Sequence, residues 1–312
     1  MSRCNVSYPT SCVNTKEEEM TPPSVDKLKA FFYWINERHM IYLRRRGHHP
    51  PPWTKDPIFQ RNKFCNVFRE LDRTTVWIRK NWREPFADHK NLAFAMAVAR
   101  QINRTETLEE IRFPKRWNPE RVLKILRERI KSGKKAYTGA YMLTGTLGGD
   151  KPSQTVNKIL TPLFKNPPVF IPNMTLEAAW GLYRGRPGFG DFLSYEVVSD
   201  LRYTRYLMDA PDILTWANPG PGAKRGLHRV WGRPVRRKVD RSYVQVSHAQ
   251  ALDEMRFLLG VSRKFLKDYV PNLELREVEH SLCEFDKYER ARLGQGVLAR
   301  FHTLCQRGRG LA

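Results

Sequence analysis

The chain has 312 residues, of which 41% are hydrophobic and 12% aromatic, so it can bury a large core and is not a disordered chain. Lys and Arg number 55 against 32 Asp and Glu, a formal net charge of +23 at pH 7 that favours a polyanion such as nucleic acid as partner. The longest apolar run, residues 92–99, is too short to cross a bilayer, so no membrane partner is expected.

The two ends of the chain differ in composition from the rest. Residues 1–24 contain the acidic run Glu17 to Glu19 and no apolar signal core, which predicts a flexible leader and a protein of the cytoplasm. Residues 306–312 are rich in Arg and Gly and predict a basic tail. The cysteines are odd in number and form no C-x-x-C pair, so we expect reduced thiols and no structural zinc site. They are Cys4, Cys12, Cys65, Cys283 and Cys305.

Helical periodicity dominates residues 25–305. Apolar residues recur every three or four positions from Leu28 to Leu43, and this predicts a helix that ends before Gly47. A second stripe runs from Val67 to Trp82, and the run at 92–99 predicts one buried helical face. Because no convincing series of alternating strands is present, we predict an all-α fold.

Later helices have recognisable starts. Asn118, Pro119 and Glu120 supply an N-cap, a proline at the first helical position and an acid in the first turn. A further helical pattern starts near Thr175, and others cover residues 193–201 and 278–285. The proline-rich loop between these patterns predicts a lobe boundary near residues 165–175, within one unit that spans residues 25–305.

The stretch from Trp216 to Leu227 places two prolines and two glycines beside two adjacent cations. In a helix-hairpin-helix, such a turn directs backbone N–H groups toward a DNA phosphate, and glycine is needed because a side chain would block the approach. The predicted phosphate ligands are the backbone and side chains of Gly220, Gly222, Ala223, Lys224 and Arg225. The alternative is an ordinary Pro-Gly turn with solvated cations. Ten Lys or Arg against three acids between Arg202 and Arg241 favour the phosphate interpretation.

A hairpin of this kind is also typical of base-excision DNA glycosylases, in which a catalytic aspartate follows the glycines at a similar distance. Here Asp240 lies 20 residues after Gly220. The intervening helix of the glycosylases is apolar, whereas this chain is strongly basic over residues 229–238. Asp240 is therefore either a catalytic acid or a neutraliser of the neighbouring arginines.

Six separated stretches occur in a characteristic order. They are Phe31–His39, Lys63–Arg73, Tyr137–Tyr141, Tyr195–Arg202, Pro219–Gly222 and Leu282–Tyr288. Together they resemble the proteins of thymine hypermodification, namely the helical domains of 5-hydroxymethyluracil DNA kinases and the related α-glutamyl/putrescinyl-thymine pyrophosphorylases. The resemblance implies a DNA-glycosylase-like helical fold. It also implies a pathway, largely of phages, in which 5-hydroxymethyluracil in DNA is converted to a pyrophosphate ester that an amine then displaces.

The kinase step of that pathway needs a phosphate-binding loop of the form G-x-x-x-x-G-K-[ST]. The nearest stretch, Gly145 to Pro152, places Asp150 at the second glycine and Pro152 at the hydroxyl position. Because an acid there would repel phosphate, we do not expect a P-loop kinase in this chain, and we expect a separate kinase as a partner.

A transferase of this pathway needs an extruded base, cations beside the departing pyrophosphate and a base that accepts the proton of the amine. The candidate acids are Asp72, Asp200, Glu284 and Asp286, with Asp240 for excision. The candidate cations beside them are Arg69, Arg73, Arg202 and Lys287. For each of these, an ion pair on the surface of a helix is the alternative interpretation. Trp77, Trp82 and Phe86 either stack the extruded base or belong to the core.

The leading functional prediction is transfer of an amino acid or polyamine amine onto a pyrophosphorylated 5-hydroxymethyluracil in DNA. A non-catalytic DNA-binding partner of a separate kinase is the first alternative, and a base-excising glycosylase is the second. No His/Cys set has the spacing of a metal site, so none is predicted, and Mg²⁺ bound with the pyrophosphate is the only cofactor considered. The expected setting is the cytoplasm of a phage-infected bacterium.

Overall fold

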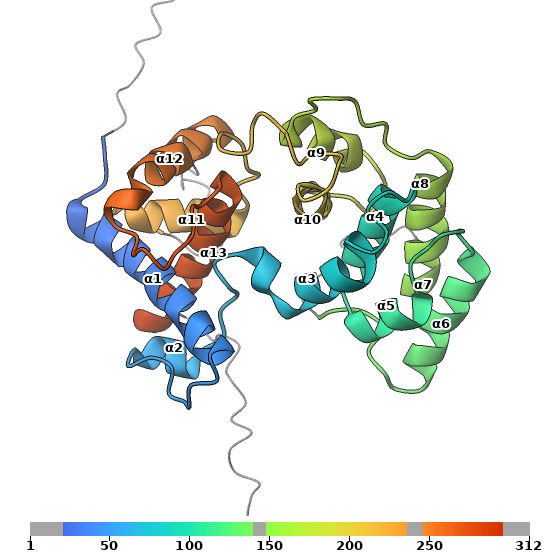
Figure 1. The fold of residues 1–312 in the computed structure, drawn as a ribbon, viewed down its shortest axis with the longest axis horizontal. Helices are drawn as coiled ribbons and strands as arrows, with labels where there is room; N and C mark the ends of the chain where they lie inside the picture. Colours follow the sequence, from blue (N-terminus) through green and yellow to red (C-terminus); the bar gives the residue numbers. More distant parts are fainter. Residues whose placement is uncertain (1–20, 140–147, 236–245, 296–312) are drawn as a thin grey trace, which may run out of the picture.

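The computed structural model describes residues 21–139, 148–235 and 246–295. Within these ranges the chain forms helices and no strand, which confirms the predicted all-α class. Figure 1 shows two groups of helices, joined by the segments that pass between them. The first group contains α1 (Val25–Arg46), α2 (Pro57–Arg61), α11 (Pro221–Val230), α12 (His248–Val261) and α13 (Leu275–Arg292). The second contains α3 (Arg73–Ile78), α4 (Leu92–Ile102), α5 (Thr105–Ile111), α6 (Pro119–Lys131), α7 (Lys151–Ser153), α8 (Thr161–Lys165), α9 (Leu176–Arg184) and α10 (Asp191–Leu201).

The chain passes between the two groups twice, in segments 62–72 and 202–220. The first group is therefore built from both ends of the described chain, and the second from its middle. The segment 165–175, where we expected a boundary, joins α8 to α9 within the second group. None of the helices in the described ranges is both long and apolar enough to cross a membrane.

Local sequence signals begin several of these helices. The Asn118 side chain accepts a hydrogen bond from the Arg121 amide at 2.9 Å and caps α6, and Thr175 accepts one from the Ala178 amide at 3.0 Å and caps α9. Gly47 ends α1 as predicted. A side-chain oxygen at the N-cap satisfies an amide that has no partner within the helix. The predicted helix starts at Asn118 and Thr175 are thus confirmed.

Two predicted patterns differ from the structure. Every residue of α4 is buried, including Arg100 and Gln101, so residues 92–99 form a helix enclosed on all sides rather than one buried face. The stripe from Val67 to Trp82 is not one helix. It contains the short 3-10 turn η1 (Arg69–Leu71), then α3, and then the π-helical segment η2 (Arg79–Arg83).

Helices α11 and α13 approach each other so closely that a Cβ atom at either of two glycines of α11 would force a neighbouring atom of α13 to move. A Cβ atom on Gly222 would lie 2.3 Å from the Cys283 sulfur, and one on Gly226 would lie 2.3 Å from the Leu282 carbonyl oxygen. The two glycines are four residues apart and therefore lie on one face of α11. Helix packing accounts for Gly222 without any ligand.

We expect Gly226→Ala to destabilise the protein by about 2 kcal/mol or more, because the new methyl group would have to push two backbones apart. Gly181→Ala in α9 is the matched control, since no atom lies within 4 Å of its Cβ position, and we expect it to be neutral or stabilising by up to about 1 kcal/mol. Urea unfolding of the two variants measures both effects. Equal stability of both variants would contradict the close approach of α11 and α13.

Candidate active site at the junction of the helix groups

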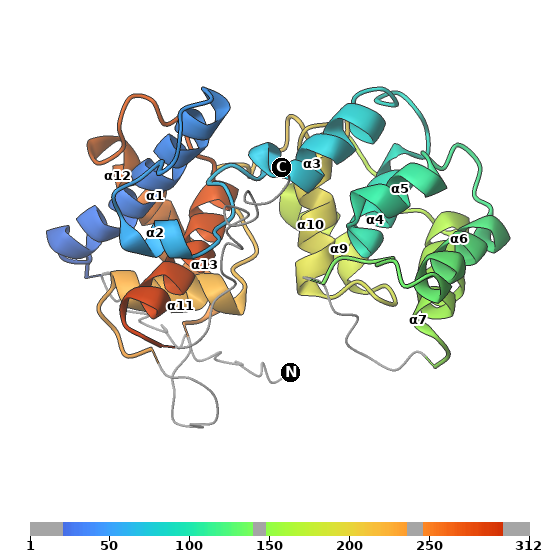
Figure 2. The ribbon, with the colours of Figure 1, turned by 90° about the horizontal axis from the view of Figure 1, so that it is seen from below.

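A group of polar side chains lies where the connecting segment 62–72 meets α13. In Figure 2 this segment, which includes the short turn before α3, passes between the two groups of helices. The Cys65 sulfur, an Asp72 carboxylate oxygen and a His280 ring nitrogen all lie within 4.8 Å of one another. We refer to these three residues as the Cys-Asp-His cluster.

Asn66 holds two members of the cluster in place. Its backbone amide and its side-chain amide donate to Asp72 Oδ1 at 3.0 and 2.9 Å, and it also makes a backbone hydrogen bond with the His280 ring. His280 is only 8% exposed, and its Nε2 atom has no hydrogen-bond partner within residues 21–139, 148–235 and 246–295. Burial, and after it the positive charges of Arg69, Lys287 and Arg276, place the pKa of His280 well below its ordinary value. The imidazole is therefore neutral at physiological pH.

Glu284 and Lys287 lie directly beside the cluster. Glu284 is 2% exposed, accepts a hydrogen bond from the Cys65 amide at 3.0 Å and pairs with Lys287. Burial, together with the charges of Glu284 and Asp72, raises the pKa of the Cys65 thiol to about 12. Burial alone would lower the pKa of Lys287, but the adjacent Glu284 carboxylate raises it above its ordinary value. Lys287 therefore keeps its charge at this site.

Arg69 connects the cluster to the second helix group. It pairs with Glu196 of α10, and its Nε lies 3.8 Å from Asp72 Oδ2. The structure thus gathers four of the predicted site residues, Arg69, Asp72, Glu284 and Lys287, around one point. Sequence analysis missed Cys65 and His280 as members of this site, because they are far apart in the chain and share no local spacing.

The other two predicted acids of the described chain, Asp200 and Asp286, are bound by arginines. Asp200 is 1% exposed and accepts from Arg100 Nε at 2.6 Å, which ties α10 to α4. Asp286 is fully buried and pairs with Arg225 and Arg229 of α11 at 2.9 and 2.7 Å. Either carboxylate would have to leave its arginines before it could accept a proton from a substrate. Their catalytic roles stay predictions.

Asp200→Asn should destabilise the protein by about 3 kcal/mol, because it removes the nearer of the two carboxylates that pair with the buried Arg100 guanidinium in the described chain and leaves Glu196, at 3.7 Å. The control is Asp253→Asn, which breaks an exposed pair with Arg256 and should change the stability by less than about 0.5 kcal/mol. Urea unfolding monitored by circular dichroism measures both. If Asp200→Asn is as stable as the wild-type protein, Asp200 is available for chemistry and the structural role assigned to it here is wrong.

The Pro-Gly turn begins α11, with Gly220 as its N-cap. The Gly220 amide donates to Glu279 Oε1 of α13 at 3.4 Å, so a carboxylate of the protein itself already lies at this positive helix end. Of the predicted phosphate ligands, Ala223 is fully buried and Arg225 pairs with Asp286. Lys224 is half-buried and forms no ion pair with any residue that the structure describes. The proposed contact with phosphate therefore depends mainly on Lys224 and on displacement of Glu279.

The pKa of Glu279 is raised to about 7, chiefly by burial and also by the charge of Glu196, while the Gly220 amide and Arg69 oppose the shift. The folded state therefore binds more protons than the unfolded state between about pH 4.5 and 7, so stability should fall as pH rises through this window. Glu277 has a similarly raised pKa and contributes a parallel effect. We expect Glu279→Gln to reduce this slope by up to about 1.4 kcal/mol per pH unit. Urea titrations at several pH values measure it, and an unchanged slope would show that Glu279 ionises normally.

The remaining predicted residues have separate surroundings. Arg73 is exposed at the start of α3, and Arg202 pairs with Glu274 at 2.7 Å. Asp240 lies outside the described residues. Asp150 stands where the phosphate-binding loop pattern has its second glycine. Its side chain caps α7 by accepting a hydrogen bond from the Ser153 amide, and it pairs with Arg127.

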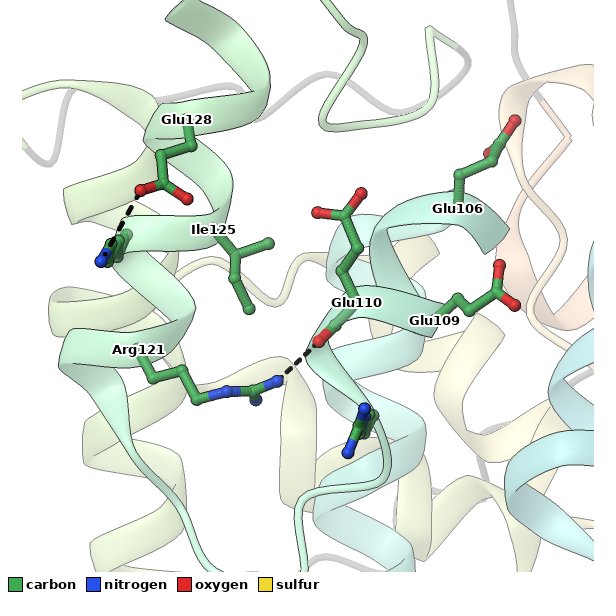
Figure 3. A pocket seen from close by; sticks show the side chains of 8 residues that line it. Glu106, Glu109, Glu110, Arg121, Ile125 and Glu128 are labelled. Carbon is green, nitrogen blue, oxygen red and sulfur yellow. Dashed lines mark hydrogen bonds and ion pairs between the residues drawn. The ribbon is translucent and has the colours of Figure 1, made fainter. Parts of the chain in front are cut away.

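Two hollows occur on the second helix group, away from the cluster. One, of about 600 Å³, lies between α5 and α6 and is shown in Figure 3, where Glu106, Glu109 and Glu110 lie opposite Arg121. Arg121 donates to the Glu110 backbone carbonyl at 2.7 Å, so this contact fixes the two helices together. The other, of about 780 Å³, combines aromatic and basic residues. Its walls include Trp77, Trp82, Phe86, Trp117, Arg112 and Lys115.

Comparison with known proteins places the chain in a family. Residues 26–297 match the family described as "5-hmdU DNA kinase, helical domain". A protein of Bacillus phage SP10 named 5-hmdU DNA kinase is 28% identical over 295 residues. That alignment covers 82% of this chain and 44% of the phage protein, so the chain spans less than half of its relative's length. No solved structure matches. The resemblance that the sequence stretches indicated is confirmed, and the chain belongs to the 5-hmdU DNA kinase helical domain family.

Proposed function

We propose that this protein modifies DNA bases derived from 5-hydroxymethyluracil, by transferring the amine of an amino acid or polyamine onto the pyrophosphorylated base. In this reaction the amine nitrogen bonds to the methylene carbon of the base, the bond from that carbon to the pyrophosphate oxygen breaks, and the amine releases a proton. The observation that carries the proposal is the gathering of acids and cations at the helix junction of a chain in the 5-hmdU DNA kinase helical domain family.

The junction offers each group that this reaction requires. Glu284 is the proposed base for the amine proton, because its carboxylate lies beside the Cys-Asp-His cluster and is held by the Cys65 amide. Lys287 and Arg69 are the proposed cations for the departing pyrophosphate, and Mg²⁺ bound with that group is a further source of positive charge. Asp72, near Arg69, is the second candidate acid.

DNA is the proposed macromolecular partner. The net charge of +23 favours it, and the exposed cations Arg73, Arg112 and Lys115, with the half-buried Lys224, could contact the backbone. The target base must leave the stack to meet an enclosed carboxylate. The aromatic and basic hollow offers a stacking surface for a nucleotide, and the turn at Gly220 keeps its proposed role in a glycosylase-like helix-hairpin-helix. The proposed location is the cytoplasm of a phage-infected bacterium.

A second candidate is a DNA-holding partner of a separate kinase. It is favoured by the name of the phage relative and by the fact that the alignment covers only 44% of that protein. In this case the chain would bind DNA containing 5-hydroxymethyluracil and present the base to the kinase, without turnover of its own. A base-excising glycosylase, with Asp240 as the catalytic acid, is the third candidate.

The test incubates the protein with DNA carrying pyrophosphorylated 5-hydroxymethyluracil and a pool of amino acids and polyamines. Nucleoside mass spectrometry then detects an added amine, and a phosphate assay detects released pyrophosphate. We expect amine addition by the wild-type protein and a loss of about 10²-fold or more in Glu284→Gln, because the proton acceptor is removed while the shape is kept. DNA affinity should stay unchanged.

Glu289→Gln is the matched control. Glu289 lies on the same helix and pairs with Arg292 at the same i, i+3 spacing as Glu284 with Lys287, but it lies outside the junction site. Its variant should keep turnover within a few-fold. Equal turnover in both variants would exclude Glu284 as the base. DNA binding without amine addition would favour the kinase partner, and abasic sites would favour the glycosylase.

A further inference from the structure

The Cys-Asp-His cluster combines a sulfur, a carboxylate oxygen and a ring nitrogen whose atoms lie within 4.8 Å of one another. We propose that Cys65, Asp72 and His280 form a binding site for a divalent transition-metal ion of the Zn²⁺ class. The three side chains would leave a fourth position for water or for an oxygen of a bound ligand. This site goes beyond the proposed transfer reaction and does not depend on it.

The donor set selects the class of metal. Thiolate and imidazole suit Zn²⁺ and related transition metals, whereas Mg²⁺ and Ca²⁺ prefer oxygen ligands throughout. Three protein ligands with one open position are typical of zinc sites that bind a further molecule, while structural zinc sites have four protein ligands. Ligand atoms around zinc lie about 3.5 Å apart, given bond lengths of about 2.0 to 2.3 Å, so small side-chain rotations bring the observed atoms into range.

The His280 side chain supplies the second, independent observation. It is more than nine-tenths buried, and its Nε2 atom has no hydrogen-bond partner in the part of the chain that the structure describes. A buried polar atom without a partner is unfavourable and calls for a ligand or another physical explanation. The backbone hydrogen bond with Asn66 fixes the ring, and Asn66 also fixes Asp72 through two hydrogen bonds. Such outer contacts are typical of metal ligands, because they orient the donor atoms.

The surrounding charges allow a cation at this point. Arg69, Lys287 and Arg276 lie near His280, but each of them is paired with a carboxylate, namely Glu196, Glu284 and Glu277. Arg38 is the other cation that acts on Cys65 and Asp72. Asp72 and a Cys65 thiolate would carry the negative charge that balances a divalent ion. Glu284, which contacts the Cys65 amide, adds a further carboxylate to the immediate surroundings.

The test uses the 312-residue chain with Cys4, Cys12 and Cys305 replaced by serine, so that only Cys65 and Cys283 remain. The protein is stripped with a chelator and titrated with Zn²⁺, and separately with Co²⁺, in the absence of DNA and amine. We expect one equivalent of tightly bound Zn²⁺ and, with Co²⁺, a thiolate-to-metal charge-transfer band. Cys65→Ser should abolish the band, and Cys65→Ser and His280→Gln should each weaken Zn²⁺ binding by about 100-fold or more.

Cys283→Ser is the matched control. Cys283 is a partly buried cysteine like Cys65, but it lies on α13 outside the cluster. It should retain both the stoichiometry and the band. Circular dichroism verifies the fold of each variant, and Zn²⁺ should raise the Tm of the parent protein and of Cys283→Ser but not of Cys65→Ser. Less than a tenth of an equivalent of bound Zn²⁺ in the parent protein would overturn the proposal, as would binding that survives Cys65→Ser and His280→Gln. Either result leaves the proposed transfer reaction standing, since its assay reads amine addition to DNA.

Discussion

Buried carboxylates paired with arginines are the interaction on which the arrangement of these helices depends. Asp286 draws Arg225 and Arg229 of α11 onto α13, and Asp200 draws Arg100 of α4 onto α10. A buried carboxylate without a partner would be strongly destabilising, so each pair fixes which helix faces which. In a protein with so large an excess of basic residues, many of the cations therefore stabilise the fold, and the net charge overstates how many are available to the proposed DNA partner.

The Cys-Asp-His cluster differs from these pairs in what it leaves unsatisfied. Asp200 accepts hydrogen bonds from Arg100, whereas the His280 Nε2 atom has no partner among the residues that the structure describes, although it is buried among polar groups. Protein interiors rarely keep such an atom unless a ligand or a function requires it. Asp200 and Asp286 therefore hold helices together, whereas His280 in the Cys-Asp-His cluster keeps an atom that can bind a ligand.

Interactions within one helical turn could be predicted from the sequence, whereas contacts between distant segments could not. The caps at Asn118 and Thr175 depend on an amide three residues away, so their residue types predicted them. Lys287 was assigned beside Glu284 for the same reason. Gly222 was expected at a phosphate because its neighbours are basic, but the residue that requires a glycine there is Cys283. No local pattern links Cys65 to His280, since their proximity arises only when segment 62–72 packs on α13.

Helix α13 takes part both in packing and in the junction site, because one of its faces contacts α11 and another contacts segment 62–72. Glu279, Cys283 and Asp286 recur at helical spacing and contact α11, where they meet the Gly220 amide, Gly222 and two arginines. His280, Glu284 and Lys287 each follow one residue later and lie toward Cys65 and Asn66. A one-residue offset along the helix thus separates the face that packs the Pro-Gly turn from the face that supplies the junction site. The Pro-Gly turn and the junction site therefore both rest on contacts with the same helix.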